Sequence, residues 1–387
     1  MPSCDIFCTV IDNFGDIGTS WRLARQLAAE HGWQIRLWVD KLQTFSHLCP
    51  SIDPQARKQQ VDDIIVEQWS TDRDIETPIE VADIVIEAFA CNPPPAYIAA
   101  MADRAAHQHA PVWINLEYLS SEPWVADFHL KPSPHPAYPL LKTFFFPGLT
   151  AGTGGVLQER ALLASQQAFV ADPNARTRYC TALGIPPAAA QGTLVSLFCY
   201  ANANLETLLS AWRESATPLT CIAPDGLISS AIAHFLGIPA LTVGTVATRG
   251  NLTVCAVPFV EQSRYDPLLW ACDINFVRGE DSFVRAQWAQ KPLVWQLYPQ
   301  HDNAHYVKLD AALAAYALGL PADARLALTH FWHNWNTPSP SPIALDWDDF
   351  WQHRNTLAQH AMVWAQSLAK LGDLASNLAQ FCESQLK

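Results

Sequence analysis

The sequence has no long apolar run and no surplus of positive charge. None of its windows reaches the roughly 18 consecutive apolar residues that a membrane-spanning helix requires. The first residues, "MPSCDIFCTVIDN", lack the basic segment that opens a signal peptide. The formal net charge of -13 argues against nucleic-acid binding, because contacts to phosphates need a stripe of Lys and Arg. We therefore expect a cytoplasmic protein with neither a membrane nor a nucleic acid as partner.

The usual cysteine patterns of metal sites are also missing. The chain has ten cysteines but no C-x-x-C pair, and Cys4 and Cys8 are too widely spaced for a zinc knuckle. Four other cysteines lie within or beside apolar runs: Cys199, Cys221, Cys255 and Cys272. This placement is typical of buried thiols that pack as small hydrophobic groups. We expect no structural metal and no disulfide.

The chain does have the material for two hydrophobic cores. Half of its 387 residues are hydrophobic and only 16% are charged. Its opening predicts a strand at "CDIFCTVI", then a helix capped by Thr19 or Ser20 that runs to about Glu30 and ends at Gly32. The next strand is predicted at "WQIRLWVD". A strand, a helix and a strand in succession form one unit of a parallel sheet.

The same alternation occurs twice along the chain. In the first half, strand patterns follow at "VADIVIEAF", "PVWINLEYL" and "KTFFFPGL". After a helical stretch and the predicted loop "GIPPAAAQG", the alternation restarts at "TLVSLFCY", includes a strand at "ALTVGTV", and ends at "PLVWQLYP". The rest of the chain is predicted to be mainly helical. We therefore predict an α/β fold of two facing Rossmann-like parallel-sheet domains, with a ligand cleft between the carboxyl ends of their strands.

Two aspartates follow the first predicted strand. Asp12 and Asp16 lie around an Asn-Phe-Gly turn, in which Gly15 and Gly18 permit tight geometry. The carboxyl end of a strand in such a sheet faces the ligand crevice, so both side chains are candidates for binding or catalysis. Asp16 alone could instead cap the helix, but capping does not need two aspartates. No G-x-G-x-x-G pattern occurs here, which disfavours a nicotinamide oxidoreductase.

A second candidate site opens the helix in "NFVRGEDSFVRAQWAQ". After Arg278 and Gly279, the residues Glu280, Asp281 and Ser282 begin a helix whose unpaired N–H groups could bind a diphosphate. Ser282 could add a hydroxyl. The alternative is an ordinary helix cap provided by Asp281 or Ser282.

Aromatic residues end two predicted strands of the second half. Phe198 and Tyr200 end "TLVSLFCY", Phe259 ends "LTVCAVPF", and Gln262 is close by. Their rings could stack on a nucleobase, while the hydroxyl or amide contacts its edge or the phosphate. Most aromatic residues in a chain of this composition belong to the core, so the alternative is a packing role.

Two further stretches give weaker signals. Asp302 and Asn303 follow a proline turn and precede a helix, a position that could contact a sugar, although polar residues are common in such loops. The glycines Gly152, Gly154 and Gly155 lack the Lys-Ser/Thr that follows the glycines of a phosphate-binding P-loop. We interpret this stretch as a mobile loop at the edge of the cleft.

Three long segments resemble the bacterial EarP family, the protein-arginine rhamnosyltransferases that modify elongation factor P (EF-P). They are "DIFCTVIDNFGDIGTSWRLARQLAAEHGW", "FPGLTAGTGGVLQE" and "RGEDSFVRAQWAQKPLVWQLYPQ". The resemblance implies a GT-B glycosyltransferase fold, a dTDP-β-L-rhamnose donor, no metal or other cofactor, and inversion at the anomeric carbon. The implied acceptor is one arginine of EF-P, whose modification would activate that factor for polyproline-stalled ribosomes. We expect a monomer.

The resemblance also implies roles for individual residues. Asp12 and Asp16 correspond to the acceptor-side aspartates, with Asp16 as general base and Asp12 orienting the arginine, and Glu280 corresponds to an essential glutamate. The implied nucleotide site is Phe198, Tyr200, Phe259, Gln262, Asp281 and Ser282, to which we add Arg278 and Asn303 by their neighbourhood. We place the domain boundaries at residues 1–156, with a C-terminal helix at about 365–387 packing back on this domain, and 157–364.

Two alternatives remain open at this point. The chain could be a GT-B transferase with another nucleotide sugar or a small-molecule acceptor, because no motif specifies the donor. It could also be a catalytically silent nucleotide-sugar-binding or protein-binding module on the same fold. The presence of Asp12, Asp16 and Glu280 argues against the silent module.

Overall fold

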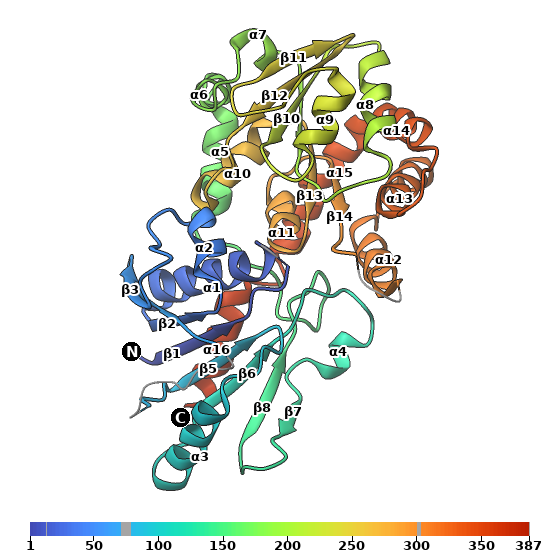
Figure 1. The fold of residues 1–387 in the computed structure, drawn as a ribbon. Helices are drawn as coiled ribbons and strands as arrows, with labels where there is room; N and C mark the ends of the chain where they lie inside the picture. The colour runs from blue at the N-terminus through green and yellow to red at the C-terminus, as the bar shows by residue number, and fades with distance from the viewer. Residues whose placement is uncertain (13, 71–78, 300–302, 387) are drawn as a thin grey trace. The chain divides into compact units, whose positions relative to one another are not determined.

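The computed structural model describes residues 1–12, 14–70, 79–299 and 303–386. The chain divides into two compact units. The N-terminal unit contains residues 1–160 and 368–387, and the C-terminal unit contains residues 161–367. Each unit has its own sheet with helices packed on it (Figure 1). None of the helices in the described residues is both long enough and apolar enough to cross a bilayer.

The N-terminal unit is built on a sheet with the strand order β3-β4-β2-β1-β5-β6-β8-β7. The six inner strands are parallel, and the edge strands β3 and β7 are antiparallel to their neighbours. The strands are β1 (Ser3–Cys8), β2 (Gln34–Val39), β3 (Lys58–Val61), β4 (Ile64–Gln68), β5 (Ile84–Ala88), β6 (Val112–Leu116), β7 (Pro132–Pro134) and β8 (Leu141–Phe145). The helices are α1 (Gly15–His31), α2 (Leu42–Leu48), α3 (Pro95–His107), α4 (Val125–Phe128) and α16 (Leu374–Gln385).

Helices cover both faces of this sheet because the side chains of β1 alternate between two cores. Phe7 packs in a cluster with Tyr97 and Met101 of α3. Cys8, on the opposite face, is fully buried on the side of the sheet that α1 covers. Burial on both faces explains why the central strands read as continuous apolar runs.

Helix α1 begins earlier than the sequence predicts. It starts at Gly15, so Thr19 and Ser20 lie within its first two turns and the predicted capping role was wrong. The Asp16 side chain is the reason, because it accepts hydrogen bonds from backbone groups just ahead of the helix. The predicted end of the helix is confirmed: Gly32 adopts a φ of 69°, and its N–H donates to the last turn.

The glycine-rich stretch after β8 is closely packed on its own unit. A Cβ atom at Gly154 would lie 2.3 Å from the Phe145 ring, and one at Gly155 would lie 2.4 Å from the carbonyl oxygen of Gly372. The adjacent Val156 pairs with Asp373, which caps α16 by accepting from the N–H of Ser376. Glycine is therefore required here for close approach of the backbone, rather than for the mobility that we expected.

The C-terminal unit has a second sheet, with the order β11-β12-β10-β9-β13-β14. Its strands are parallel except for β11 at one edge. The strands are β9 (Thr193–Leu197), β10 (Leu219–Pro224), β11 (Val246–Arg249), β12 (Leu252–Val257), β13 (Ile274–Arg278) and β14 (Leu293–Gln296). The helices are α5 (Leu162–Ala171), α6 (Ala175–Ala182), α7 (Pro187–Ala190), α8 (Leu205–Glu214), α9 (Ser229–Leu236), α10 (Gln262–Ala271), α11 (Asp281–Trp288), α12 (Ala304–Tyr316), α13 (Ala322–Asn336), α14 (Ile343–Gln352) and α15 (Arg354–Ala369).

Two local predictions in this unit differ from the structure. The predicted loop "GIPPAAAQG" contains the short helix α7, whose start is favoured by its proline. The strand predicted at "ALTVGTV" is a turn until Val246, because Thr245 hydrogen-bonds back to Thr242 and Gly244 has a φ of 87°. The predicted α/β class, with two Rossmann-like sheets, is confirmed.

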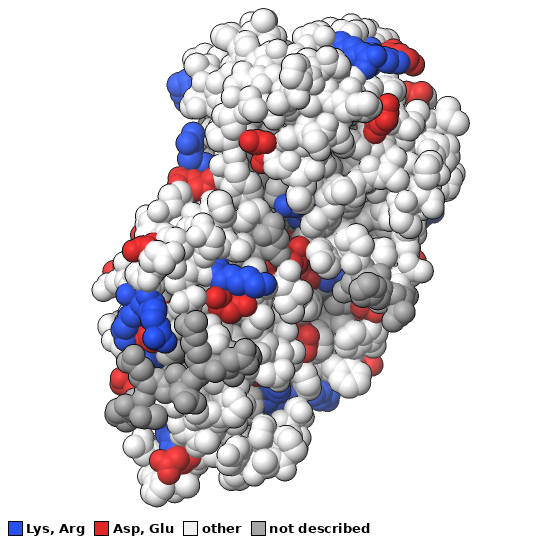
Figure 2. Space-filling view, in the orientation of Figure 1, with Lys and Arg blue, Asp and Glu red and all other residues white. Residues whose placement is uncertain are grey.

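The four cysteines expected to be buried are buried. Cys199, Cys221, Cys255 and Cys272 are at most 3% exposed. Burial raises the pKa of Cys199 to about 12 and that of Cys255 to about 11, so these thiols are uncharged at neutral pH. Charged groups of both signs are scattered over the face shown in Figure 2, where the described residues form no extended basic stripe.

Candidate active site

The turn that follows β1 is organised by a buried carboxylate. Asp16 is only 2% exposed, and its Oδ2 accepts hydrogen bonds from the N–H groups of Ile11 and Asp12, both at 2.7 Å. Hydrogen bonds from backbone N–H groups stabilise the charged form of a carboxylate. The two aspartates predicted as a pair are therefore brought together on one turn.

The Asp12 carboxylate lies over the first residue of α1. A Cβ atom at Gly15 would be 2.7 Å from Asp12 Oδ2, and the N–H of Gly15 donates to the Asp12 carbonyl at 2.6 Å. Glycine at this position leaves room for the carboxylate, which is closer than a real Cβ contact allows. The turn thus presents two negative groups at the carboxyl end of β1.

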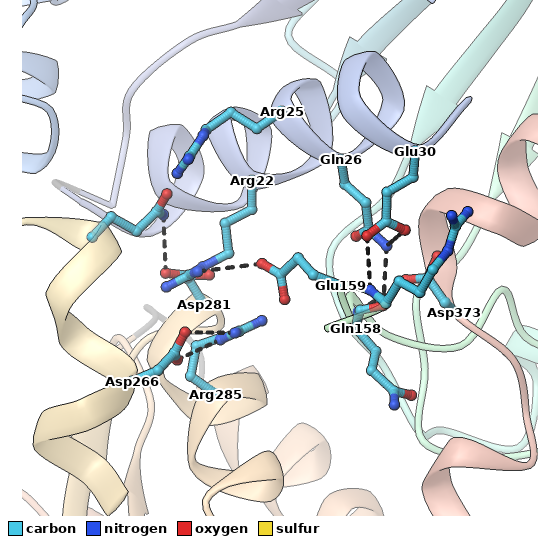
Figure 3. Close-up of polar contacts among 12 residues, drawn as sticks. Arg22, Arg25, Gln26, Glu30, Gln158, Glu159, Asp266, Asp281, Arg285 and Asp373 are labelled. Carbon is cyan, nitrogen blue, oxygen red and sulfur yellow. Dashed lines mark hydrogen bonds and ion pairs between the residues drawn. The ribbon is translucent and has the colours of Figure 1, made fainter. Parts of the chain in front are cut away.

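The surrounding charges of the turn come from three other elements. Asp40, at the end of β2, accepts from the N–H of Val10 at 2.9 Å, and Lys41 donates to the carbonyl of Val10 at 2.5 Å. On α1, the buried Arg22 lies 3.5 Å from Glu159 (Figure 3). The sequence analysis did not single out Asp40, Lys41 or Arg22, because each reaches the region through packing across the sheet or along α1.

A strained loop lies at the same edge of this sheet. Phe89, Ala90 and Asn92 follow β5 with φ values of 58°, 53° and 52°. The Phe89 ring stacks on Tyr118, which follows β6, at 4.5 Å between centroids. Non-glycine residues with positive φ are uncommon and gather at functional sites. The sequence analysis did not single out this loop, because Phe89 and Ala90 are not residue types that favour positive φ.

In the C-terminal unit, an arginine organises the ends of the strands. The Arg278 guanidinium, at the end of β13, lies over Phe198 at 4.3 Å and over Tyr200 at 4.6 Å from the ring centroids. It also donates to the Cys199 carbonyl at 3.2 Å and is 7% exposed. The backbone of Tyr200 is held by Gln296 at the end of β14. Arg278 is thus in direct contact with two aromatic residues that were predicted from another part of the sequence.

The remaining aromatic residue lies beside this group. The Phe259 ring is 6.2 Å from that of Phe198, with 59° between the planes. A base stacked between two rings would need the two ring planes to be parallel and about 7 Å apart, which is twice an ordinary carbon–carbon contact distance. Entry of a base between Phe198 and Phe259 would therefore require their rings to rotate and separate slightly.

The start of helix α11 carries the predicted acidic residues. Gly279, with a φ of 64°, turns the chain between β13 and Glu280, and its carbonyl accepts from the Trp295 indole at 2.7 Å. Glu280 occupies the N-cap position without a side-chain cap and forms an ion pair with Lys308 of α12. The sequence analysis missed Lys308, since it is 28 positions away from Glu280.

Helix α11 is held against α10 by two polar contacts (Figure 3). Arg285, 1% exposed, donates to both oxygens of Asp266, at 2.7 Å from Nε and 2.6 Å from Nη2. Gln262, the first residue of α10, donates to Asp281 at 3.4 Å. The forked pair fixes the helix, and the second contact links two predicted site residues. Ser282 lies in the first turn of α11.

Asn303 stands just before α12. It has a φ of 57°, is exposed, and makes no side-chain cap. Asp302 lies outside the described residues. The neighbouring His305 is 6% exposed, and burial lowers its pKa, so its neutral form is favoured. Lys308 connects α12 to Glu280, which is the link between this loop and the predicted site.

One group in the described residues has the composition of a metal site. The ligand atoms of Glu30, His31 and Asp373 lie within 4.8 Å of one another. Their oxygens already have structural partners: Glu30 accepts from the N–H of Arg160, and Asp373 accepts from Gln158 and Ser376 (Figure 3). These contacts attach both α1 and the C-terminal helix to the backbone of residues 158–160, which accounts for the cluster.

The two sets of residues suit different chemistry. The Asp12 and Asp16 carboxylates can accept hydrogen bonds from a planar, multi-donor cation. The start of α11, with Arg278 beside it, supplies N–H groups and positive charge to an anion.

The whole chain matches a known protein family. Residues 4–383 match the family model described as Elongation-Factor P (EF-P) rhamnosyltransferase EarP. The protein-arginine rhamnosyltransferase of Pseudomonas putida is 46% identical over 384 residues, covering 99% of each chain. That of Pseudomonas aeruginosa is 43% identical over 381 residues, covering 98% of this chain and 99% of the relative.

A solved structure is also similar over nearly its full length. It is described as the structural basis for EarP-mediated arginine glycosylation of translation elongation factor EF-P, and it covers 99% of both chains. The TM-score is 0.70 and the sequence identity is 34%.

Proposed function

The chain belongs to the EarP family of protein-arginine rhamnosyltransferases, and we propose that it transfers L-rhamnose from dTDP-β-L-rhamnose to one arginine of EF-P. The observation that carries this proposal is the pair of carboxylates on the turn after β1. Asp16 is buried and fixed by two backbone N–H groups, and Asp12 lies against Gly15. A guanidinium has five donors in one plane and needs at least two acceptors to orient it.

Proton removal cannot come first in this reaction. The pKa of arginine lies far above that of aspartate, so full proton transfer beforehand would cost about 12 kcal/mol. In the proposed mechanism, Asp12 and Asp16 bind the guanidinium and localise a lone pair on one terminal nitrogen. The proton then passes to Asp16 as the new bond forms, because substitution makes that nitrogen more acidic.

The sugar transfer itself exchanges one bond for another. The guanidino nitrogen forms a bond to the anomeric carbon, and the bond from that carbon to the diphosphate oxygen breaks. Its electron pair leaves with dTDP, so negative charge develops on the leaving diphosphate. We assign its stabilisation to the N–H groups at the start of α11 and to Arg278. Lys308 neutralises Glu280, which limits repulsion between this carboxylate and the diphosphate.

Base binding is assigned to the aromatic residues. Phe198 and Phe259 are the pair between which thymine would stack, after the ring movement described above. Tyr200 and Arg278 then bind the diphosphate of the donor together, because the Tyr200 ring holds the Arg278 guanidinium beside its phosphates.

Intact-mass analysis tests the proposed reaction. EF-P incubated with this protein and dTDP-rhamnose should gain the mass of one deoxyhexose, located by fragmentation on one arginine. A parallel set with UDP-sugars distinguishes the donor, and an EF-P variant with that arginine replaced by Lys is the control. A mass gain with a UDP-sugar alone would overturn the donor assignment, and modification of the Lys variant would overturn the acceptor.

A further inference from the structure

The C-terminal unit contains a cavity at the amino ends of its strands, whereas Arg278 lies at the carboxyl end of β13. Its volume is about 670 Å³, and it is lined by the residues just ahead of β10, β9, β13 and β14 and by the start of α15. Reaction sites of parallel α/β sheets lie at the carboxyl ends of the strands. This cavity lies at the amino ends, so the proposed transfer reaction does not account for it.

The lining of the cavity carries positive charge. Arg176 and Asp273 carry opposite charges and pair with each other. Arg176 Nη1 donates to Asp273 Oδ1 at 3.0 Å, and Nη2 donates to Oδ2 at 3.1 Å. Asp273 also accepts from the N–H of Leu194 at 2.8 Å, so its oxygens are occupied. Lys291 and Arg354 remain, and neither is within ion-pair distance of a carboxylate in the part of the chain that the structure describes. Two uncompensated cations thus face one cavity in a chain of net charge -13.

The position of Arg354 adds to this field. Its guanidinium lies over the Trp351 ring at 4.3 Å, and it donates to the Trp351 carbonyl at 2.7 Å, which holds the side chain in place. Arg354 is also the first residue of the 16-residue helix α15 and comes directly after α14, which ends at Gln352. The opposed ends of two helix dipoles meet there, so the guanidinium itself supplies the net positive charge.

We propose that this cavity is a second ligand site, which binds a small anion of the phosphate or diphosphate class. Lys291 supplies a compact charge that suits phosphate oxygens, and Arg354 supplies a fixed fork. Thr193 and Asn355 add neutral donors at its wall. The site is independent of the transfer reaction proposed above, and its failure would leave that reaction intact.

The test uses inorganic pyrophosphate and the full chain in isothermal titration at constant ionic strength. We expect Lys291→Gln to weaken pyrophosphate binding about tenfold, and the Lys291→Gln/Arg354→Gln pair to weaken it further. Lys370→Gln, an exposed lysine of the N-terminal unit, is the matched control and should leave the affinity unchanged. Melting temperatures establish that each variant is folded.

Pyrophosphate could also bind beside Arg278, so a second variant separates the two sites. Arg278→Gln should retain the binding that Lys291→Gln loses, and hydrogen exchange should slow in residues 351–358 of the wild type when the probe is added. Loss in Arg278→Gln with retention in Lys291→Gln would overturn the proposal. So would a wild-type Kd weaker than about 1 mM. Tighter binding of citrate than of pyrophosphate would overturn the phosphate class.

Discussion

In the N-terminal unit the candidate groups come from a single turn, whereas in the C-terminal unit they come from several distant elements. Asp12 and Asp16 are connected through the backbone N–H groups of residues 11 and 12. The second group joins the ends of β9, β13 and β14 to the starts of α10 and α11 and to Lys308 on α12. A local turn keeps its geometry even when distant parts move, but a site assembled from several elements depends on their packing.

This contrast divides the proposed roles. The turn offers two carboxylates in fixed positions, which suits orientation of a cation and acceptance of its proton. The assembled site offers aromatic faces that must separate before a base can enter, and the helix α11, which the Arg285–Asp266 pair holds at its last turn. Substitutions in the first region should therefore change turnover, and those in the second should change donor affinity.

The largest effect is expected from Asp16→Asn. An amide oxygen can still accept from the N–H groups of Ile11 and Asp12, so the turn should remain folded, but the base is lost. We expect the turnover rate to fall by about 10² to 10⁴-fold, with dTDP affinity unchanged. Rates under saturating donor, together with calorimetry of dTDP binding, measure the two effects.

The control for this variant is Asp63→Asn, an exposed aspartate in the same unit. It should retain wild-type turnover. A parallel loss of dTDP affinity in Asp16→Asn would contradict the division of roles, because it would place Asp16 at the donor.

A smaller effect is expected from Phe259→Ala. Loss of a stacking ring should weaken dTDP binding by about 1–3 kcal/mol, the range found for bases stacked on aromatic side chains. Turnover at saturating donor should change less than affinity does. Titration of dTDP into this variant is the measurement, and Phe169→Ala, which removes a ring on α5, is the matched control. Unchanged affinity would remove Phe259 from the base site.

The smallest effect is expected from a chelator, which should leave the transfer activity unchanged. If the start of α11 and Arg278 stabilise the leaving diphosphate, the reaction needs no divalent ion there. Activity measured with and without EDTA, after dialysis against it, should be equal within error. A large loss that added Mg²⁺ restores would show that the C-terminal site requires a metal and would leave the acceptor turn unaffected.

The same contrast explains what the sequence could predict. Most of the strands, the end of α1 at Gly32 and the pairing of two aspartates on one turn depend on neighbours in the chain, and apolar patterns and turn residues indicate them. The short strands β3, β4 and β7 were not predicted. The start of α1 was mispredicted because the Asp16 side chain accepts a hydrogen bond from the loop that precedes the helix. The preference of Thr19 and Ser20 for N-cap positions does not indicate this contact.

Contacts between distant elements of the C-terminal unit could not be predicted from apolar patterns and turn residues. The position of Arg278 over Phe198 and Tyr200 depends on the register of β13 against β9. The pairing of Glu280 with Lys308 depends on how α12 packs. The strained loop contains no glycine, and Phe89 and Ala90 are not residue types that favour positive φ, so only Asn92 carried a weak signal. Its residues could be found only once the backbone was known.

Gly15 gives a criterion for judging other chains of this family. The atom nearest to an added Cβ would be the tip of the Asp12 side chain, which can swing aside at little energetic expense. A chain with alanine at this position would therefore fold normally and still contain both aspartates, yet present one of them in the wrong place. Inspection of the aspartates alone would class such a chain as active, whereas inspection of the glycine would identify it as impaired.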